Sequence, residues 1–240
     1  MSKYYEKRVI NNNDISYEEA YWGTIKDPDG KIRNRLNEKQ KFLDNVKSEL
    51  EFINKLPSSK ILDIGCGLGY MLAGISDKHQ KFGLEVSKFA TSEAEKYAKI
   101  FNEPFEDIDL KENSFDIIIS HHVIEHIDSP ENFLTKIKKI LKPNGILIIS
   151  TPDFKSVCAN LFNDKYRMLH DKTHTSLFSF DSLKLMLNDF KFEITDFEFP
   201  YFNTEYFTDE NILKLLNYNT NEISPACWGN FVTFYAKNKK

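Results

Sequence analysis

An apolar run that leads into a cluster of glycines constrains the fold of this chain more than any other feature of its sequence. Lys60–Ile64 is short and apolar, as a strand buried on both faces is, and Gly65, Gly67 and Gly69 follow it. Glycine permits a tight turn and a close approach of the backbone to a ligand. The segment therefore predicts a central strand that ends in a ligand-binding turn.

Strands and helices alternate through the middle of the chain. Helices are expected over 70–78 and from 129–131 onward, and strand-like runs occur at Lys81–Glu85, Phe115–Ser120 and Ile146–Ser150. This alternation favours an α/β fold whose parallel sheet is covered by helices on both faces.

The two ends of the chain differ from its middle. Apolar residues recur with helical spacing from about Arg35 to Leu56, which predicts one amphipathic helix. Lys191–Phe199 and Phe231–Ala236 have the character of strands, and the long connection between them favours an antiparallel edge on the sheet.

The length of 240 residues suits one α/β domain with insertions. We expect residues 59–240 to form this domain and residues 1–58 to form a helical N-terminal cap that belongs to it. The stretches 152–178 and 201–226 are irregular and are expected to cap a site.

Charge and cysteines limit the partners and the compartment. The net charge is −4 and the only basic run is at 237–240, so we expect no nucleic-acid partner. The three cysteines lack C-x-x-C spacing, which argues against a zinc knuckle or a disulfide framework. No signal peptide or membrane-spanning segment is evident, which predicts a cytoplasmic protein without membrane contact.

An acidic residue stands where a ribose-binding group belongs. Glu85 ends the second predicted strand, 20 residues after Gly65, and a carboxylate there can accept hydrogen bonds from both ribose hydroxyls. Two other interpretations stay open, a structural turn that binds nothing and a dinucleotide-dependent oxidoreductase. The second fits poorly, because Tyr70 stands where the dinucleotide fingerprint requires glycine.

Three motifs resemble those of class I S-adenosylmethionine-dependent methyltransferases of the small-molecule type. They are Leu62–Gly69, the strand and loop Phe115–His126, and the turn Lys142–Leu147, and the resemblance covers about 60–200. It implies a Rossmann-like, doubly wound, seven-stranded sheet that is mostly parallel and ends in an antiparallel hairpin. It also implies S-adenosylmethionine as the cofactor.

The resemblance implies which residues hold that cofactor. Asp63 and the loop backbone would hold the methionine end, Glu85 the ribose, and Val86 would lie beside the adenine. Relatives often carry an aspartate for the adenine amino group where this chain has Pro104, so that contact passes to the next two residues or to the backbone. His121 would lie near the sulfonium or the amino-acid end. The full expected set is Asp63, Gly65, Cys66, Gly67, Glu85, Val86, Phe105, Glu106 and His121.

Five of the six histidines follow the fourth and fifth predicted strands, where ligands of open α/β sheets bind, whereas His79 is expected on a surface turn. A hydroxyl acceptor must lose a proton, and histidine can take it near neutral pH. Asp171–His174 resembles a stretch over the acceptor pocket of small-molecule members, so His174 is the first candidate for the general base. His126 and His122 are the next candidates, although His126 has the equal alternative of orienting the loop.

A divalent metal is a competing use of the same side chains. His122, Glu125 and His126 fall on one helical turn, and with His174 they could coordinate an ion that acidifies a bound hydroxyl. Small-RNA terminal methyltransferases resemble this arrangement, with glutamate in the place of His122. A metal is admissible but not expected, because neither the loop conformation nor a fourth ligand is assured.

The acceptor is the least constrained part of the prediction. We expect an O-methyltransferase for a small-molecule hydroxyl, on a sugar or nucleotide-linked sugar of a surface polysaccharide pathway. The alternatives are a quinone or aromatic hydroxyl, an amine, and a catalytically inactive S-adenosylmethionine-binding partner protein. A homodimer is admissible, but no residue marks an interface. Candidates for the pocket wall are Tyr21, Trp22, Phe154, Tyr166, Tyr201, Phe202, Tyr206, Trp228, Arg33, Arg35 and Arg167.

Overall fold

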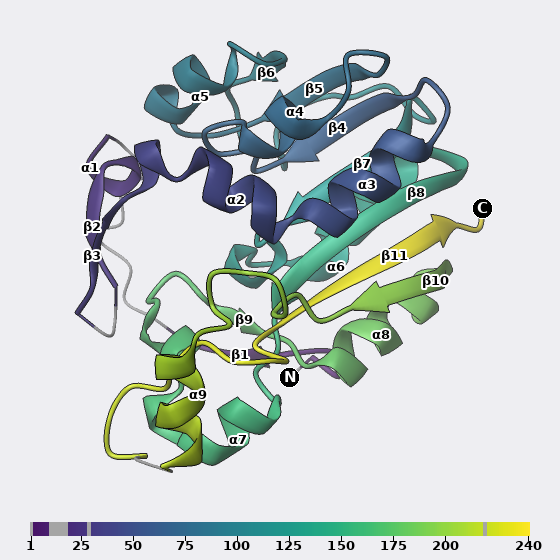
Figure 1. Ribbon diagram of the computed structural model, residues 1–240. Helices are drawn as coiled ribbons and strands as arrows, with labels where there is room; N and C mark the ends of the chain where they lie inside the picture. Colours follow the sequence, from purple (N-terminus) through teal and green to yellow (C-terminus); the bar gives the residue numbers. More distant parts are fainter. Residues whose placement is uncertain (1, 10–18, 28–29, 218–219) are drawn as a thin grey trace.

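The computed structural model describes residues 2–9, 19–27, 30–217 and 220–240, and seven of their strands form one sheet (Figure 1). The strands are β4 (Lys60–Ile64), β5 (Gln80–Leu84), β6 (Lys99–Phe101), β7 (Phe115–His121), β8 (Leu141–Pro152), β10 (Phe192–Glu198) and β11 (Phe231–Asn238). They lie in the order β10–β11–β8–β7–β4–β5–β6, and β11 runs antiparallel to both of its neighbours. The remaining neighbours are parallel, so the predicted sheet with its antiparallel C-terminal edge is confirmed.

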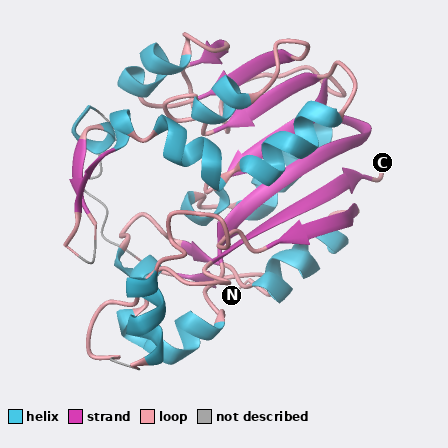
Figure 2. Ribbon diagram, in the orientation of Figure 1, coloured by secondary structure: helices cyan, strands magenta, loops and turns pink. Residues whose placement is uncertain are grey.

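Helices cover both faces of this sheet, as predicted (Figure 2). They are α2 (Lys39–Asn45), α3 (Lys47–Lys55), α4 (Tyr70–Gly74), α5 (Lys88–Ala94), α6 (Pro130–Ile140) and α8 (Phe180–Asp189). Ile117 and Ile119 of β7 share one hydrophobic cluster with residues of α3 and α4, whereas Ile118 shares a second cluster with residues of α6 and α8. This division follows from the two-residue period of a strand, which sends successive side chains to opposite faces.

Residues 35–56 do not form the one helix that their apolar spacing predicts. A 3-10 turn, η1 (Arg35–Asn37), comes first, and Val46 at the junction of α2 and α3 has φ −105° and ψ 22°. Val46 is only 2% exposed and packs in the core at this break. The apolar period continues across the break and could not reveal it. Similarly, α4 ends at Gly74 rather than near residue 78.

The outer elements gather beyond the carboxyl ends of the parallel strands (Figure 1). They are β1 (Glu6–Lys7), α1 (Glu19–Trp22), β2 (Thr24–Lys26), β3 (Ile32–Asn34), α7 (Val157–Phe162), β9 (Ser176–Leu177) and α9 (Asp209–Leu216). The N-terminal cap thus contains the hairpin β2–β3 as well as helices. In the described part of the chain, no helix has the length and apolar character needed to cross a bilayer.

Candidate active site

The glycine loop between β4 and α4 is held against the end of β5. The amides of Gly65 and Cys66 donate to the carbonyl of Leu84 over 2.8 and 3.1 Å. Gly65 and Gly67 have φ of 69° and 52°, a left-handed conformation that favours glycine. A Cβ atom at Gly65 would lie 2.6 Å from Cγ2 of Val123, so the loop packs directly on the segment that follows β7.

Two buried acids flank this loop. Glu85 accepts hydrogen bonds from the amides of Gly67 (2.9 Å) and Ser87 (2.8 Å), which fixes its carboxylate at the end of β5. Asp63 is 2% exposed, and neither of its carboxylate oxygens is hydrogen-bonded to another described residue. Burial, reinforced by the charge of Glu85, raises the pKa of Asp63 to about 8. A ligand ammonium would supply the partner that Asp63 lacks, which fits the methionine end of S-adenosylmethionine.

A cavity of about 370 Å³ opens beside the glycine loop. Asp63 and the loop form one part of its wall, and His121 and His122 at the end of β7 form the next. The N-terminal cap and residues from the segment 200–206 complete it. The cavity therefore joins the predicted methionine end of the cofactor site to one of the two predicted capping segments.

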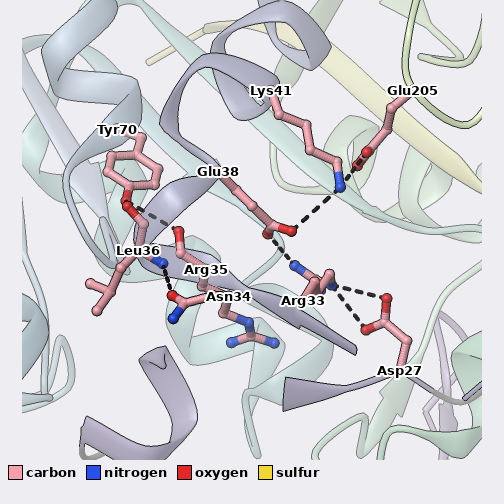
Figure 3. A network of polar contacts seen from close by, with 9 residues as sticks. All are labelled: Asp27, Arg33, Asn34, Arg35, Leu36, Glu38, Lys41, Tyr70 and Glu205. Carbon is pink, nitrogen blue, oxygen red and sulfur yellow. Dashed lines mark hydrogen bonds and ion pairs between the residues drawn. The ribbon is translucent and has the colours of Figure 1, made fainter. Parts of the chain in front are cut away.

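Charged residues tie the cap to the segment 200–206 along this wall (Figure 3). Arg33 donates to both carboxylate oxygens of Asp27, over 3.0 and 2.9 Å, and also to Glu38. Lys41 pairs with Glu38 over 3.4 Å and with Glu205. The network neutralises most of the charge in the wall and joins parts of the chain that are far apart in sequence.

His122 faces the cavity with an ionised carboxylate behind it. Its ring packs edge-on against Phe231 at a centroid distance of 4.8 Å, and its Nδ1 lies 3.3 Å from Oε1 of Glu125. Burial by itself would raise the pKa of the fully buried Glu125, but the hydrogen bond with His122 and two nearby histidines lower it to about 2. Because an ionised carboxylate can only accept, Nδ1 carries the hydrogen and Nε2 remains an acceptor. The pair is thus arranged to take up a proton.

His126 and His174 lie behind this pair and do not line the cavity. Nδ1 of His126 is 3.1 Å from the Thr173 carbonyl, and Nδ1 of His174 is 2.7 Å from the Met168 carbonyl. A carbonyl can only accept, so Nδ1 carries the hydrogen in both rings. Nitrogen atoms of these two rings and an oxygen of Glu125 all lie within 4.8 Å of one another, close enough to share a divalent metal. Three of the four predicted metal ligands therefore meet.

The residues predicted for the adenine lie outside the cavity. Phe105 is 4% exposed, and its ring packs against Phe133 at a centroid distance of 5.2 Å within the core. Glu106 is exposed, and its carbonyl accepts a hydrogen bond from Lys136. Val86 is 49% exposed and open to a ligand. The residues predicted to hold the methionine end of the cofactor thus line a cavity, whereas the predicted adenine contacts stay a prediction.

The capping segments contribute unequally to the cavity. Within the described residues, none from 152–178 lines it, and the hydroxyl of Tyr166 instead donates to the carbonyls of Asp153 and Asn230 inside the core. His79 lies on a turn between α4 and β5, as expected, where its amide donates to the carbonyl of Ser76, but its side chain is only 4% exposed. Among the predicted aromatic and basic wall residues, those that do line the cavity are Trp22, Arg33, Arg35 and Tyr206.

Three charged residues of the cavity wall were not predicted from the sequence. Glu38, Lys41 and Glu205 stand in polar stretches that resemble solvated surface. Only folding brings positions 41 and 205 together, so no local pattern could have indicated them. Tyr70 is the wall residue that the sequence could have indicated, because it directly follows the glycine loop. In the structure its hydroxyl donates to the carbonyl of Leu36 over 2.9 Å and so connects the loop to the N-terminal cap.

Similarity to known proteins identifies the family of this chain. A family model described as a methyltransferase domain matches residues 33–196. A ubiquinone biosynthesis O-methyltransferase of Bradyrhizobium diazoefficiens is 31% identical over 147 residues, covering 56% of this chain and 56% of that protein. The chain spans about half the length of the curated relatives it matches.

Solved structures share the fold. The Haloferax volcanii partner of the Trm112 methyltransferase activator has a TM-score of 0.65 at 17% identity, covering 85% of this chain and 93% of that one. A SAM-dependent methyltransferase of Thermotoga maritima has a TM-score of 0.59 at 23% identity, covering 85% and 96%. S-adenosylmethionine is the cofactor that this family and fold imply. With the family model matched over most of its sheet, the chain belongs to the methyltransferase-domain family.

Proposed function

We propose that this chain transfers a methyl group from S-adenosylmethionine to a hydroxyl of a small aromatic acceptor of the quinone type. The relatives named as ubiquinone biosynthesis O-methyltransferases favour this acceptor over the sugar expected from the sequence. The observation that carries the proposal is the His122–Glu125 pair, because His122 lines the same cavity as the glycine loop and the buried Glu125 lies behind it.

Bound S-adenosylmethionine supplies an electrophilic methyl group. The chain must hold the acceptor hydroxyl in the cavity and take its proton. Nε2 of His122 accepts that proton, and the buried carboxylate of Glu125 stabilises the imidazolium that results. The rings of Tyr206 and Phe231 in the cavity wall supply surface for an aromatic acceptor.

The test is the formation of S-adenosylhomocysteine with two acceptor panels, hydroxylated benzoquinols and nucleotide-linked sugars. His122→Gln should lower kcat by about 100-fold or more, the usual effect of losing a general base, while the affinity for S-adenosylhomocysteine stays unchanged. The matched control is His170→Gln, since His170 is exposed and outside the cavity. Full turnover by His122→Gln would contradict the assignment of His122 as the general base. Methylation of the sugars alone would contradict the proposed aromatic acceptor.

Metal-assisted transfer is a second candidate, favoured by the cluster of Glu125, His126 and His174. Histidines that bind metals commonly donate their other ring N–H to a carbonyl, as both histidines do here. In this alternative Glu125, His126 and His174 would hold a divalent metal, and the chemistry that it would supply is the acidification of a hydroxyl. Dialysis against EDTA separates the two, because only this alternative predicts loss of turnover that Mg²⁺ or Zn²⁺ restores. His174→Gln should then abolish the response to added metal.

A further inference from the structure

The cofactor site built so far lacks a group for one charge of its ligand. The amino-acid end of S-adenosylmethionine carries an ammonium and a carboxylate. Asp63 suits the ammonium, because its carboxyl oxygens can accept hydrogen bonds, but it offers no positive charge to the carboxylate of the ligand. A cation elsewhere in the same cavity would bind that carboxylate through strong, charge-assisted hydrogen bonds.

Three side chains of lysine or arginine line the cavity within the described residues, and two are already paired. Arg33 is bound by Asp27 and Glu38, and Lys41 by Glu38 and Glu205. His121 does not substitute for them, because its ring packs against Phe42 and His122 at centroid distances of 5.9 and 4.5 Å and its Nε2 lies 3.7 Å from Oε1 of Glu49. The remaining cation is Arg35.

No described residue accepts a hydrogen bond from the Arg35 guanidinium, and Figure 3 draws it without a contact. The group instead lies over the ring of Tyr21, 4.0 Å from its centroid, and 5.8 Å from that of Trp22. Both rings attract a cation electrostatically but leave its N–H groups unpaired. A planar guanidinium with unpaired N–H groups matches a carboxylate, which it can bind through two parallel hydrogen bonds.

The backbone ties Arg35 to the glycine loop. Its amide donates to the Gly23 carbonyl over 3.2 Å, and its carbonyl accepts from the Tyr70 hydroxyl over 3.2 Å, where Tyr70 begins the helix after the loop. Trp22 contacts the loop as well, since a Cβ atom at Gly67 would lie 2.8 Å from its Cη2. The cap and the loop therefore face the cavity as neighbours.

We propose that Arg35, carried by the N-terminal cap, binds the carboxylate of the amino-acid end of the cofactor. This assignment rests on the proposed function, in that it requires S-adenosylmethionine at the glycine loop. It makes the cap a part of the cofactor site, with Tyr21 and Trp22 holding the guanidinium in place.

Titration calorimetry with two ligands tests this assignment. S-adenosylhomocysteine carries the amino-acid group, whereas 5′-methylthioadenosine lacks it. Arg35→Gln should lower the affinity for S-adenosylhomocysteine by about tenfold or more, as expected for a lost charge-assisted hydrogen bond. The affinity for methylthioadenosine should fall by less than about twofold. Lys39→Gln is the matched control for a lost positive charge, since Lys39 lies on the neighbouring helix and does not line the cavity.

The outcomes separate this inference from the proposed function. An equal loss of affinity for both ligands would mean that Arg35 only supports the cap. Unchanged affinity for both would mean that Arg35 makes no contact with the ligand carboxylate. Both results overturn the inference while the wild-type protein still binds S-adenosylhomocysteine. Failure of the wild-type protein to bind either ligand would overturn the cofactor site itself. Binding of methylthioadenosine by Arg35→Gln also reports that the variant is folded.

Discussion

At the scale of single residues, Asp63 couples the cofactor site to stability. Its pKa is about 8 in the folded chain, raised by burial and by Glu85 from an ordinary value of 3.8. The folded state therefore keeps a proton that the unfolded state loses, and stability falls as pH rises between these two values. Asp63 alone should make the free energy of unfolding of the ligand-free protein fall by at most about 1.4 kcal/mol per pH unit across this window. The buried Glu49, whose pKa burial likewise raises to about 8, adds to this slope.

Asp63→Asn should reduce that slope, though not abolish it, between about pH 5 and pH 8 in urea unfolding curves. Asp109→Asn, at an exposed position, is the control and should leave the slope unchanged. An identical slope in wild type and Asp63→Asn would show that Asp63 is not protonated in the folded chain. Glu125 acts with the opposite sign, since its pKa is lowered to about 2 and its contribution is lost only as pH falls below about 4.5.

At the scale of elements, the sequence predicts helices and strands that have a local apolar pattern, but it does not predict features that depend on tertiary packing. The strands β4, β7 and β8 follow from apolar runs, because a strand buried on both faces needs little else. The break at Val46 does not follow, since the apolar period is the same on both sides of it. The hairpin β2–β3 could not be predicted from the sequence either, because its strands, Thr24–Lys26 and Ile32–Asn34, are too short to show an alternating apolar pattern.

The contact between α2 and the segment 200–206 gives a prediction at this scale. Glu205→Gln removes one of the two acidic partners of Lys41, the one that joins α2 to the segment 200–206, which should open the cavity wall while leaving the glycine loop intact. Partly exposed ion pairs contribute about 0.5 kcal/mol, so KM for the acceptor should rise about twofold with cofactor affinity unchanged. Limited proteolysis should also cut near this segment sooner. Glu193→Gln, which breaks the exposed pair with Lys239 at the sheet edge, is the control and should change neither property.

At the scale of the whole molecule, the candidate site is predictable where it follows a strand and unpredictable where it is assembled from distant segments. Asp63, Gly65 and His121 come from strand ends, and topology alone brings such ends together. His174, a candidate through the family resemblance of Asp171–His174, lies behind the cavity wall with its ring hydrogen-bonded to the Met168 carbonyl. Glu205 enters the cavity only through its contact with the cap, which no motif encodes.

The same contacts predict that cap and sheet unfold together. Ile53 of α3 is 0% exposed and lies in one cluster with Ile117 and Ile119 of β7, so the cap region shares its core with the sheet. Ile53→Ala should lower the free energy of unfolding by about 2–5 kcal/mol. If cap and sheet form one cooperative unit, this change should move two urea transitions equally, the far-ultraviolet circular dichroism and the fluorescence of Trp22 in a Trp228→Phe background.

The control is Leu185→Ala, at a position 43% exposed on α8, which should change stability by no more than about 0.5 kcal/mol. Trp22 reports on the cap because its indole donates to Ser87 and lies over the glycine loop, whereas the dichroism reports on the helices and strands as a whole. A fluorescence transition that precedes the dichroism, and that Ile53→Ala leaves in place, would show that the first segment folds separately. It would then have to close over the cavity only after the sheet has formed, and Arg35 would reach the cofactor by docking rather than by folding.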